Sequence, residues 1–451
     1  MSGKKVVILD GCGVDDQDLT PVLSVLSEVL KADGEEIQTI HLRELNLAHC
    51  LGCFGCWIKT PGRCVEDDAG RQVARAFMQS DTAVLFTPVT FGGYSPDLKR
   101  MADHFIQLLS PYFRMDHGEV HHPARYAHRP RFMAVGVQRR PSAHEAQIFK
   151  TLAGRNAINL IPPSFAAEVV LASDDAVTLR GRFEALRRRC DALPYGAAAA
   201  SLLPASVEAS TFAEPMGAQR ALLIVGSPKT NERSTSSVLG SYLLNRLGSG
   251  WETETLTLRA NLNREEGEAQ LLAAAERAGL ILLVFPLYVD SLPFLVIKAL
   301  AAMARRRRNI PQPPPQRMVA IVNSGFPEIH QNAVALAICR EFAAQCGMAW
   351  AGGLALGGGG IVGGQPFSEE KRSRPPVGHI IRALDLTAAA LAEGKPVPAE
   401  AVKVMTHTPI PFLPAALWRR LYLTIGGREF ERAAARNGVS KDQMLAQPYA
   451  A

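Results

Sequence analysis

The sequence predicts an α/β fold made of two tandem, doubly wound domains. Short, uninterrupted apolar runs recur along the chain, as in strands that are buried on both faces of a parallel sheet. Segments with helical periodicity separate these runs, so that strand and helix alternate. The alternation stops near residue 195 and restarts near residue 220, and a chain of 451 residues is too long for one ordinary hydrophobic core.

The first half is expected to hold five strands and five helices. Apolar runs predict strands at residues 5–10, 36–42, 82–86, 131–137 and 168–172. Helical periodicity predicts helices at residues 19–32, 68–79, 97–109, 143–156 and 178–193. Five parallel strands in a segment of this length suit the flavodoxin-like order of a doubly wound sheet rather than a closed barrel.

The second half repeats the pattern. We expect strands at residues 220–225, 252–258, 280–285, 318–323 and 349–356, and helices at 234–247, 266–278, 295–303, 330–346 and 377–393. The predicted organisation is a first flavodoxin-like domain at 1–195, an Ala-, Ser- and Pro-rich linker at 196–219, a second such domain at 220–394 and a C-terminal extension at 395–451 with helical pieces. The apolar, proline-broken segment 409–418 is expected to pack on the body or on a second copy of the chain.

Composition excludes several classes of protein. Hydrophobic residues make up 47% and charged residues 20% of the chain, as in ordinary globular proteins. The net charge is +6, but the basic residues are scattered and lack interleaved aromatic residues, so we expect no nucleic-acid partner. No signal peptide and no apolar run of about 20 residues is visible, which predicts a cytoplasmic protein without a membrane span.

The most informative motif is a group of four cysteines. Cys50, Cys53, Cys56 and Cys64 form the pattern C-x2-C-x2-C-x7-C. In the reducing cytoplasm such a group indicates metal binding or redox chemistry rather than disulfides. An iron–sulfur cluster, free or reversibly oxidised thiols, and zinc all remain open. The cysteines in helical patterns, Cys190, Cys339 and Cys346, are expected in the core.

The polar segment after the strand at 220–225 is typical of a phosphate-binding loop. Backbone N–H groups of such a loop and the start of the next helix can converge on one anion. The candidate binding residues are Ser227, Lys229, Asn231, Ser234, Thr235 and Ser236. A polar turn that caps the helix is the alternative. Further loops at 286–293, 323–328 and 357–360 follow the next three strands, where open α/β sheets bind ligands.

With these loops, the second half resembles the NADPH-dependent FMN reductase branch of the flavodoxin-like superfamily. The resemblance implies that Ser227, Asn231, Ser234, Thr235 and Ser236 hold the FMN phosphate, with Lys229 where the family usually has Arg. It also implies that the isoalloxazine ring lies between two groups of residues: Pro286, Leu287, Tyr288 and Val289 on one side, and Asn323, Ser324 and Gly325 at its other edge.

The cysteine segment resembles that of the iron–sulfur flavoproteins, in which four thiolates hold a 4Fe–4S cluster beside a flavin. The first half is also similar to the same superfamily, and its loop at 87–95 fits that pattern. Its first loop, at 10–18, departs from the pattern because it carries four aspartates, which would repel a phosphate. We therefore expect the first domain to have lost or altered its phosphate site; aspartates that face solvent and cap the next helix are the alternative.

Together these features predict an FMN-dependent NAD(P)H oxidoreductase that passes electrons to a small-molecule acceptor such as a quinone or a flavin. The flavin would carry the chemistry, so we expect no catalytic side chain. The alternatives are an electron-transfer flavoprotein with a protein partner and a thiol or metal sensor without flavin. The two halves are expected to form an internal pseudo-dimer, and two chains could form a homodimer.

Two polar clusters complete the predictions. His117, His121 and His122 are expected in a surface loop that shapes the substrate pocket rather than in a metal site. The run Arg305–Arg308 is expected to be a solvated cap at a helix C-terminus, and binding of the NADPH 2′-phosphate is the alternative.

Overall fold

The computed structural model describes residues 4–31, 34–192, 219–229, 233–262, 264, 266–367, 375–410 and 413–450. The chain divides into two compact units, one made of Met1–Pro204 and Leu423–Ala451 and the other of Ala205–Tyr422. Apart from Gln219, the predicted linker at 196–219 lies outside the described residues. The C-terminal extension is therefore divided, and its last part belongs to the first unit.

The first unit contains a five-stranded parallel sheet with the predicted flavodoxin-like order. In the order in which they pair, its strands are β2 (Glu36–His41), β1 (Lys5–Asp10), β3 (Thr82–Pro88), β6 (Arg131–Gln138) and β7 (Phe165–Leu171). Numbered along the chain this is 2-1-3-4-5. All seven residues of β3 are buried, as the apolar run predicts for a central parallel strand.

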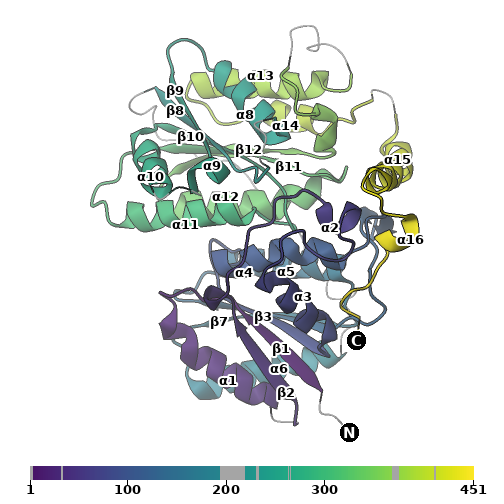
Figure 1. The fold of residues 1–451 in the computed structure, drawn as a ribbon. Coiled ribbons are helices and arrows are strands. Elements are labelled where there is room, and N and C mark those ends of the chain that lie inside the picture. Colours follow the sequence, from purple (N-terminus) through teal and green to yellow (C-terminus); the bar gives the residue numbers. More distant parts are fainter. Residues whose placement is uncertain are drawn as a thin grey trace. The chain divides into compact units, whose positions relative to one another are not determined.

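Helices cover both faces of this sheet (Figure 1). On one face α1 (Thr20–Lys31) and α6 (Ala176–Ala192) pack on each other and on the sheet. The helices on the other face are α3 (Ala69–Gln79), α4 (Pro96–Ala102) and α5 (Ala143–Leu160). The predicted doubly wound architecture of the first half is confirmed.

The second unit has the same topology. Its strands pair in the order β9 (Glu252–Thr257), β8 (Arg220–Val225), β10 (Leu280–Pro286), β11 (Arg317–Asn323) and β12 (Ala349–Leu356), all parallel. One face is covered by α8 (Thr235–Asn245), α13 (Gly378–Ala392) and α14 (Ala399–Met405), and the other by α9 (Leu258–Leu262), α10 (Gly267–Arg277), α11 (Phe294–Arg308) and α12 (Ala333–Gln345). Both predicted sheets are thus present, each with the same strand order.

The sequence did not reveal the first two of the following features, and it predicted the third only in outline. A short antiparallel hairpin joins β4 (Arg114–Asp116) and β5 (Glu119–His121) through a turn with positive φ at its two central residues. The four-residue helix α2 (Gly55–Ile58) lies within the cysteine segment. The extension, predicted as helical pieces, forms α14, one long helix, α15 (Ala415–Arg436), and a short one, α16 (Lys441–Met444).

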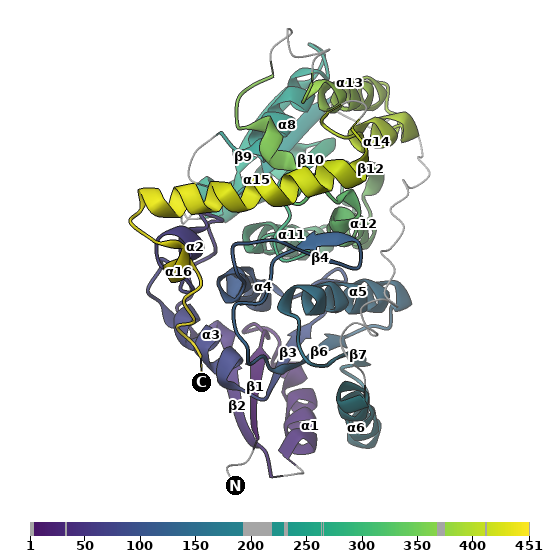
Figure 2. The ribbon, with the colours of Figure 1, turned by 90° about the vertical axis from the view of Figure 1, so that its right-hand side faces the viewer.

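The end of the extension packs against the first unit. The Phe430 ring lies 4.9 Å from that of Trp57 and 5.4 Å from that of Phe54, centroid to centroid. Met444 and Tyr449 are almost completely buried. In both views α16 and the C-terminus lie beside α2 and α3 (Figure 2). Residues more than 350 positions apart in the sequence therefore surround the cysteine segment.

The prediction for the arginine run was wrong for one of its members. Arg307 is buried and donates hydrogen bonds to the carbonyls of Cys346 and Pro314 and to Oε1 of Gln316. Its neighbours Arg305 and Arg306 are more than half exposed. One helix face therefore turns a single arginine inward, because successive residues of a helix point about 100° apart.

In the part of the chain that the structure describes, no helix is both long and apolar enough to cross a membrane.

Candidate functional site

The cysteine segment follows β2 and is folded by two residues with left-handed backbone. Gly52 has φ 61° and Phe54 has φ 54°, so the chain turns tightly between the first and third cysteines. The N–H of Gly55 donates to Sγ of Cys53 at 3.4 Å. A Cβ at position 55 would clash with a methyl carbon of Val65, so glycine is needed where the segment folds back near Cys64.

The four thiols lie close enough to influence one another's ionisation. Burial, and then the charges of Cys50, Cys64 and Cys53, raise the pKa of Cys56 well above its usual range. Burial raises the pKa of Cys50 to about 12, and the charge of Asp103 adds to this effect. Burial likewise raises the pKa of Cys64. As free thiols, Cys50, Cys56 and Cys64 are protonated near neutral pH, so metal binding would have to release their protons.

Among the described residues, no group of three or more His, Cys, Asp or Glu side chains is arranged to hold a metal ion. A four-iron cluster places a different demand on its ligands, because each of the four thiolates binds a different iron and the sulfurs do not meet at one point. The four cysteines provide the all-thiolate donor set that such a cluster requires.

Gln107 connects the cysteine segment to the C-terminus. Its Oε1 accepts a hydrogen bond from the backbone N–H of Cys64 at 3.0 Å and another from the hydroxyl of Tyr449 at 3.1 Å. The side chain is 1% exposed. The N–H of Cys64 can only donate a hydrogen bond. The side-chain amide of Gln107 must therefore turn its oxygen, rather than its nitrogen, toward Cys64.

Arg125 makes a second connection. Its Nε donates to the carbonyls of Gln107 and Leu109, both at 3.1 Å, and its Nη1 donates to those of Met444 and Ala446, both at 2.8 Å. Arg125 is 4% exposed, and burial lowers the pKa of its guanidinium. A single buried cation thus binds four carbonyls, two of which belong to the C-terminal segment.

Two donors in this region have no hydrogen-bond partner among the described residues. They are Nε2 of Gln107 and Nη2 of Arg125, and both are buried. A buried donor without a partner is costly, and native structures rarely contain one. Gln107 is bonded to Cys64, and the charge of Arg125 acts on Cys56, so two such donors near the cysteine segment fit a bound group that presents acceptors, as the sulfur atoms of a cluster would.

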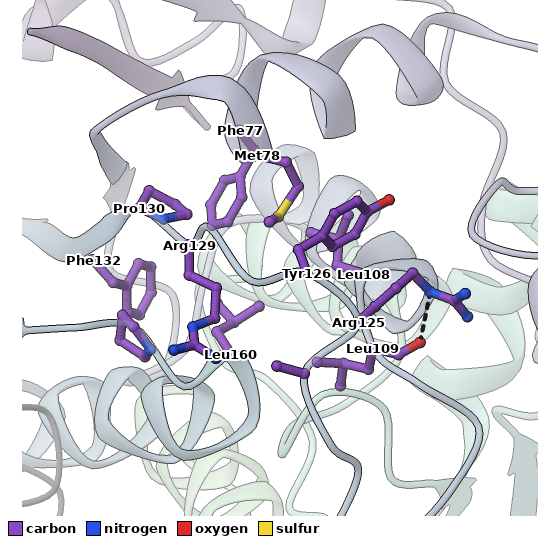
Figure 3. Close-up of a pocket in the computed structure, with 12 residues that line it drawn as sticks. Phe77, Met78, Leu108, Leu109, Arg125, Tyr126, Arg129, Pro130, Phe132 and Leu160 are labelled. Atoms are coloured by element: carbon purple, nitrogen blue, oxygen red, sulfur yellow. Dashed lines mark hydrogen bonds between the residues drawn. The ribbon is translucent and has the colours of Figure 1, made fainter. Parts of the chain in front are cut away.

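Arg125 also lines a small cavity (Figure 3). Its free space is about 10 Å³, near what one water molecule needs, and its lining is mostly apolar. In Figure 3 the Arg125 guanidinium points away from Phe132 and Leu160, and the dashed line marks its hydrogen bond to Leu109. The cavity is too small for a flavin, so it is not the predicted cofactor site.

In the second unit, the predicted phosphate-binding residues lie where β8 leads into α8. Ser234 and Ser237 form a capping box, so the hydroxyl of Ser234 is bonded within the chain. Thr235 donates its hydroxyl to the carbonyl of Gly359 at 3.1 Å. The hydroxyl of Ser234 is therefore engaged in the helix cap that the alternative interpretation predicts, and that of Thr235 is engaged with the loop at Gly359. Asn231 lies outside the described residues.

Two other hydroxyls keep a proton to donate. Oγ of Ser236 accepts from Nδ2 of Asn323 at 2.9 Å, and Oγ of Ser227 accepts from the backbone N–H of Lys229 at 3.4 Å. Both serines are buried, and an oxygen that accepts one hydrogen bond can still donate its own. Of the predicted phosphate-binding residues, Ser227 and Ser236 thus have hydroxyl protons available to a ligand, near the backbone N–H groups at the start of α8.

The predicted ring-binding loops lie together at the carboxyl edge of the second sheet. Pro286 and Asn323 end the paired strands β10 and β11, and Leu287 N–H donates to the carbonyl of Asn323 at 2.8 Å. Val289 has φ 48°, which turns the loop after Tyr288 sharply. Ser324 N–H donates to the carbonyl of Leu356 at 2.9 Å. A Cβ at Gly325 would meet no atom within 4 Å, so there is open space beside this backbone.

Tyr422 is a residue of this region that the sequence analysis missed. Its hydroxyl donates to the carbonyl of Gly325 at 2.7 Å, and Arg419, one turn earlier on α15, pairs with the buried Glu328 at 3.1 Å. The extension thus reaches the predicted ring edge. In the sequence, the aromatic and basic residues of 418–422 were the signal for this contact. Their distance in sequence from Gly325 gave no indication that they lie near it.

In the first unit, the loop after β1 binds its own carboxylates. Oδ1 of Asp10 accepts from Cys12 N–H at 2.9 Å, and Oδ2 of Asp16 accepts from Gly13 N–H at 2.7 Å. Arg139 donates to Asp16 and to Asp18 at 2.7 Å. These carboxylates therefore accept hydrogen bonds from backbone N–H groups that a phosphate bound at this loop would need. This is consistent with the expected alteration of the phosphate site in the first domain.

Asp10 does not face solvent as the alternative interpretation required. It is 1% exposed, and its Oδ2 pairs with Arg43 at 2.9 Å and with His41 Nδ1 at 2.6 Å. These partners compensate for the burial of its charge.

The prediction of a surface loop was wrong for two of the three histidines. His121 is 1% exposed and contacts Asn159 and Glu119, and His122 is buried against the rings of Trp57 and Phe113. Only His117, in the hairpin turn, is exposed. The short hairpin turns alternate residues inward, and the loop composition did not predict this.

A family model described as NADPH-dependent FMN reductase matches residues 17–169. Among curated proteins, an iron–sulfur flavoprotein of Archaeoglobus fulgidus is 30% identical over 82 residues, which are 18% of this chain and 39% of that protein. An iron–sulfur flavoprotein of Methanocaldococcus jannaschii is 28% identical over 99 residues, 22% of this chain and 50% of that protein. The chain thus spans half or less of the length of these relatives.

Solved structures with similarity include an NAD(P)H:quinone oxidoreductase from Methanothermobacter marburgensis, at 13% identity and a TM-score of 0.34, over 42% of this chain and 97% of that one. An azoreductase from Bacillus anthracis matches at 14% identity and a TM-score of 0.28, over 39% of this chain and 99% of that one. The predicted resemblance to NADPH-dependent FMN reductases is confirmed by the family match, which lies on the first unit, whereas the sequence motifs indicated it most clearly in the second.

Proposed function

We propose that the protein is an FMN-dependent NAD(P)H oxidoreductase that delivers electrons to a small-molecule acceptor such as a quinone or a flavin. The observation that carries the proposal is the match of residues 17–169 to the NADPH-dependent FMN reductases. FMN, when bound, supplies hydride acceptance from the nicotinamide and electron delivery to the acceptor. The contribution of the chain is to bind and orient the cofactor.

The second unit is the proposed FMN site, because its first loop carries one acidic residue, Glu232, whereas the corresponding loop of the first unit carries four aspartates. The hydroxyls of Ser227 and Ser236, with the N–H groups at the start of α8, would bind the phosphate. The turn at Tyr288 and the open backbone at Gly325 would border the ring. The hydroxyl of Tyr422 holds Gly325 in position through its carbonyl.

The four cysteines are proposed to hold a 4Fe–4S cluster, as the names of the curated relatives suggest. Their thiol donor set fits such a group, and so do the two nearby donors that find no acceptor in the described chain. The cluster, when bound, would supply one-electron transfer, whereas a flavin can exchange two electrons. The chain would contribute the four thiolates and exclude water from Cys56, which is 7% exposed.

The first experiment is anaerobic purification followed by an absorption spectrum and counts of flavin and iron per chain. The proposal expects about one FMN and about four irons. Cys56→Ser should lose most of the iron, whereas Cys339→Ser, at a buried cysteine outside the segment, should keep it. FMN without iron would limit the proposal to the flavin and leave the cysteines as thiols.

Oxidation of NADH and NADPH by the holoprotein then tests the reaction. Steady turnover with a quinone or free flavin is expected. A flavoprotein that does not oxidise either nicotinamide would favour the electron-transfer alternative with a protein partner. A colourless protein that takes up no FMN would overturn the oxidoreductase proposal and favour a thiol or metal sensor.

A further inference from the structure

Near the cysteine segment lie two buried hydrogen-bond donors that have no acceptor among the described residues. Nε2 of Gln107 belongs to a side chain that is 1% exposed, and Nη2 of Arg125 to one that is 4% exposed. The other polar atoms of these two side chains are bonded: Oε1 of Gln107 to Cys64 and Tyr449, and Nε and Nη1 of Arg125 to four carbonyls. Each side chain is therefore fixed, with one donor group left over.

The geometry brings these donor groups to the cysteines. Nε2 of Gln107 is bonded to the same carbon as Oε1, which receives the N–H of Cys64 at 3.0 Å, so Nε2 lies in the immediate surroundings of that cysteine. Arg125 in turn donates from Nε to the backbone carbonyl of Gln107 at 3.1 Å, which places its guanidinium beside the backbone of that residue. The charge of Arg125 also acts on the Cys56 thiol.

We propose that Gln107 and Arg125 are positioning residues of the four-cysteine centre, and that Gln107 Nε2 and Arg125 Nη2 donate N–H···S hydrogen bonds to the sulfur atoms of the bound cluster. This inference rests on the proposed cluster. Reduction adds one electron to the centre and neither forms nor breaks a bond to these donors. Hydrogen bonds to the sulfurs stabilise the reduced centre because it carries more negative charge. They therefore raise the reduction potential of the centre.

The C-terminal segment is part of this arrangement. Met444 and Ala446 accept both hydrogen bonds of Arg125 Nη1, and Tyr449 donates to Gln107. A Cβ at Gly62 would lie 2.5 Å from the ring of Pro448, so the segment packs directly on the turn before Cys64. The last residues of the chain thus hold the two side chains that donate to the centre.

Gln107→Glu is the sharpest test, because the variant keeps an oxygen for Cys64 and Tyr449 but removes the Nε2 donor. Tyr449→Phe is the matched control, since it removes the other hydrogen bond of Gln107 and leaves Nε2 in place. The measurements are iron per chain after anaerobic reconstitution, far-ultraviolet circular dichroism, and the reduction potential from a titration with dithionite and mediator dyes.

The expected result is an iron-loaded Gln107→Glu protein whose equilibrium constant for one-electron reduction falls at least about tenfold, equivalent to about 59 mV. Tyr449→Phe should stay within about twofold of the wild type.

Three results would overturn the inference. If the Gln107→Glu protein binds iron and its reduction potential is unchanged, Gln107 does not act as a donor to the cluster, and the proposed cluster itself still stands. Equal iron loss in both variants would mean that Gln107 acts only as an acceptor that holds the loop. Wild-type protein that takes up no iron would overturn the proposed cluster and this inference together, and the wild-type iron count distinguishes that case from the other two.

Discussion

The hydroxyl of Tyr449 donates a hydrogen bond to Oε1 of Gln107 at 3.1 Å, across 342 positions of the sequence. The same oxygen receives the N–H of Cys64, so a residue two positions from the end of the chain shares an acceptor with a candidate metal ligand. The C-terminal segment therefore belongs structurally to the cysteine region of the first unit.

Replacement of Tyr449 should destabilise the first unit. Its side chain is 1% exposed and lies 6.5 Å from the ring of Tyr126, so Tyr449→Ala removes a buried aromatic ring and should cost about 3 kcal/mol of the free energy of unfolding. Tyr449→Phe removes only the hydroxyl and should cost about 1 kcal/mol. Urea denaturation measures both. Leu445→Ala, at an exposed position of the same segment, should change stability by less than about 0.5 kcal/mol.

Arg307 should differ sharply from its neighbours in the run of four arginines. Arg307→Ala leaves Oε1 of Gln316 and the carbonyl of Cys346 without their donor in a buried setting, so we expect a loss of about 2–3 kcal/mol. Arg306→Ala removes an exposed side chain that pairs with Glu276, and should cost much less stability than Arg307→Ala. Equal losses for the two variants in thermal or chemical unfolding would contradict the inward role of Arg307.

Stability should fall on acidification partly through His122. Burial, then the charges of His121 and Arg114, lower the pKa of this imidazole from 6.5 to about 4, although its contact with the carbonyl of Tyr112 favours the charged form. The unfolded chain therefore takes up a proton near pH 6.5 that the folded chain does not take up until about pH 4. The free energy of unfolding should drop through this window, by about 2 kcal/mol between pH 7.5 and 5.0 from this group.

The variant His122→Asn keeps an N–H for the carbonyl of Tyr112 but cannot titrate, so its stability should depend less on pH in this window. His117→Asn changes an exposed histidine of the same hairpin and should leave the wild-type slope unchanged. Urea denaturation at the two pH values provides the comparison. If the free energy of unfolding of His122→Asn changes with pH as steeply as that of the wild type, the acid sensitivity comes from other groups. His379 is one such group, because burial also lowers its pKa to about 4.

FMN binding should depend more on Ser227 than on Thr235. Ser227 retains a hydroxyl proton for a phosphate, and a hydrogen bond to a charged group is worth about 1.5–3 kcal/mol, so Ser227→Ala should raise the Kd for FMN about tenfold or more. Thr235→Val removes a hydroxyl that already donates to Gly359 and should raise the Kd about threefold at most. Quenching of flavin fluorescence measures both. Equal effects would mean that Thr235 reorients when FMN binds.

The positions of the strands and most helices followed from the sequence because they depend on local patterns. Apolar runs such as that of β3 can only be buried on both faces, and their alternation with helices predicts a parallel sheet in flavodoxin-like order. The hairpin of β4 and β5 was missed because its three-residue strands are polar and too short to show alternation. Helix α15 was predicted only as helical pieces, because Gly426 and Gly427 interrupt its pattern.

The sequence by itself determined the two α/β sheets, the group of four cysteines, and the loops at the carboxyl ends of the second sheet. Tertiary structure decided which polar groups are buried and paired: it turned Arg307 inward but left Arg306 exposed, bonded the aspartates of the first loop to its own N–H groups, and brought Tyr449 to Gln107. Secondary structure reflects preferences over a few residues, whereas a hydrogen-bond partner hundreds of positions away is selected only when the chain packs.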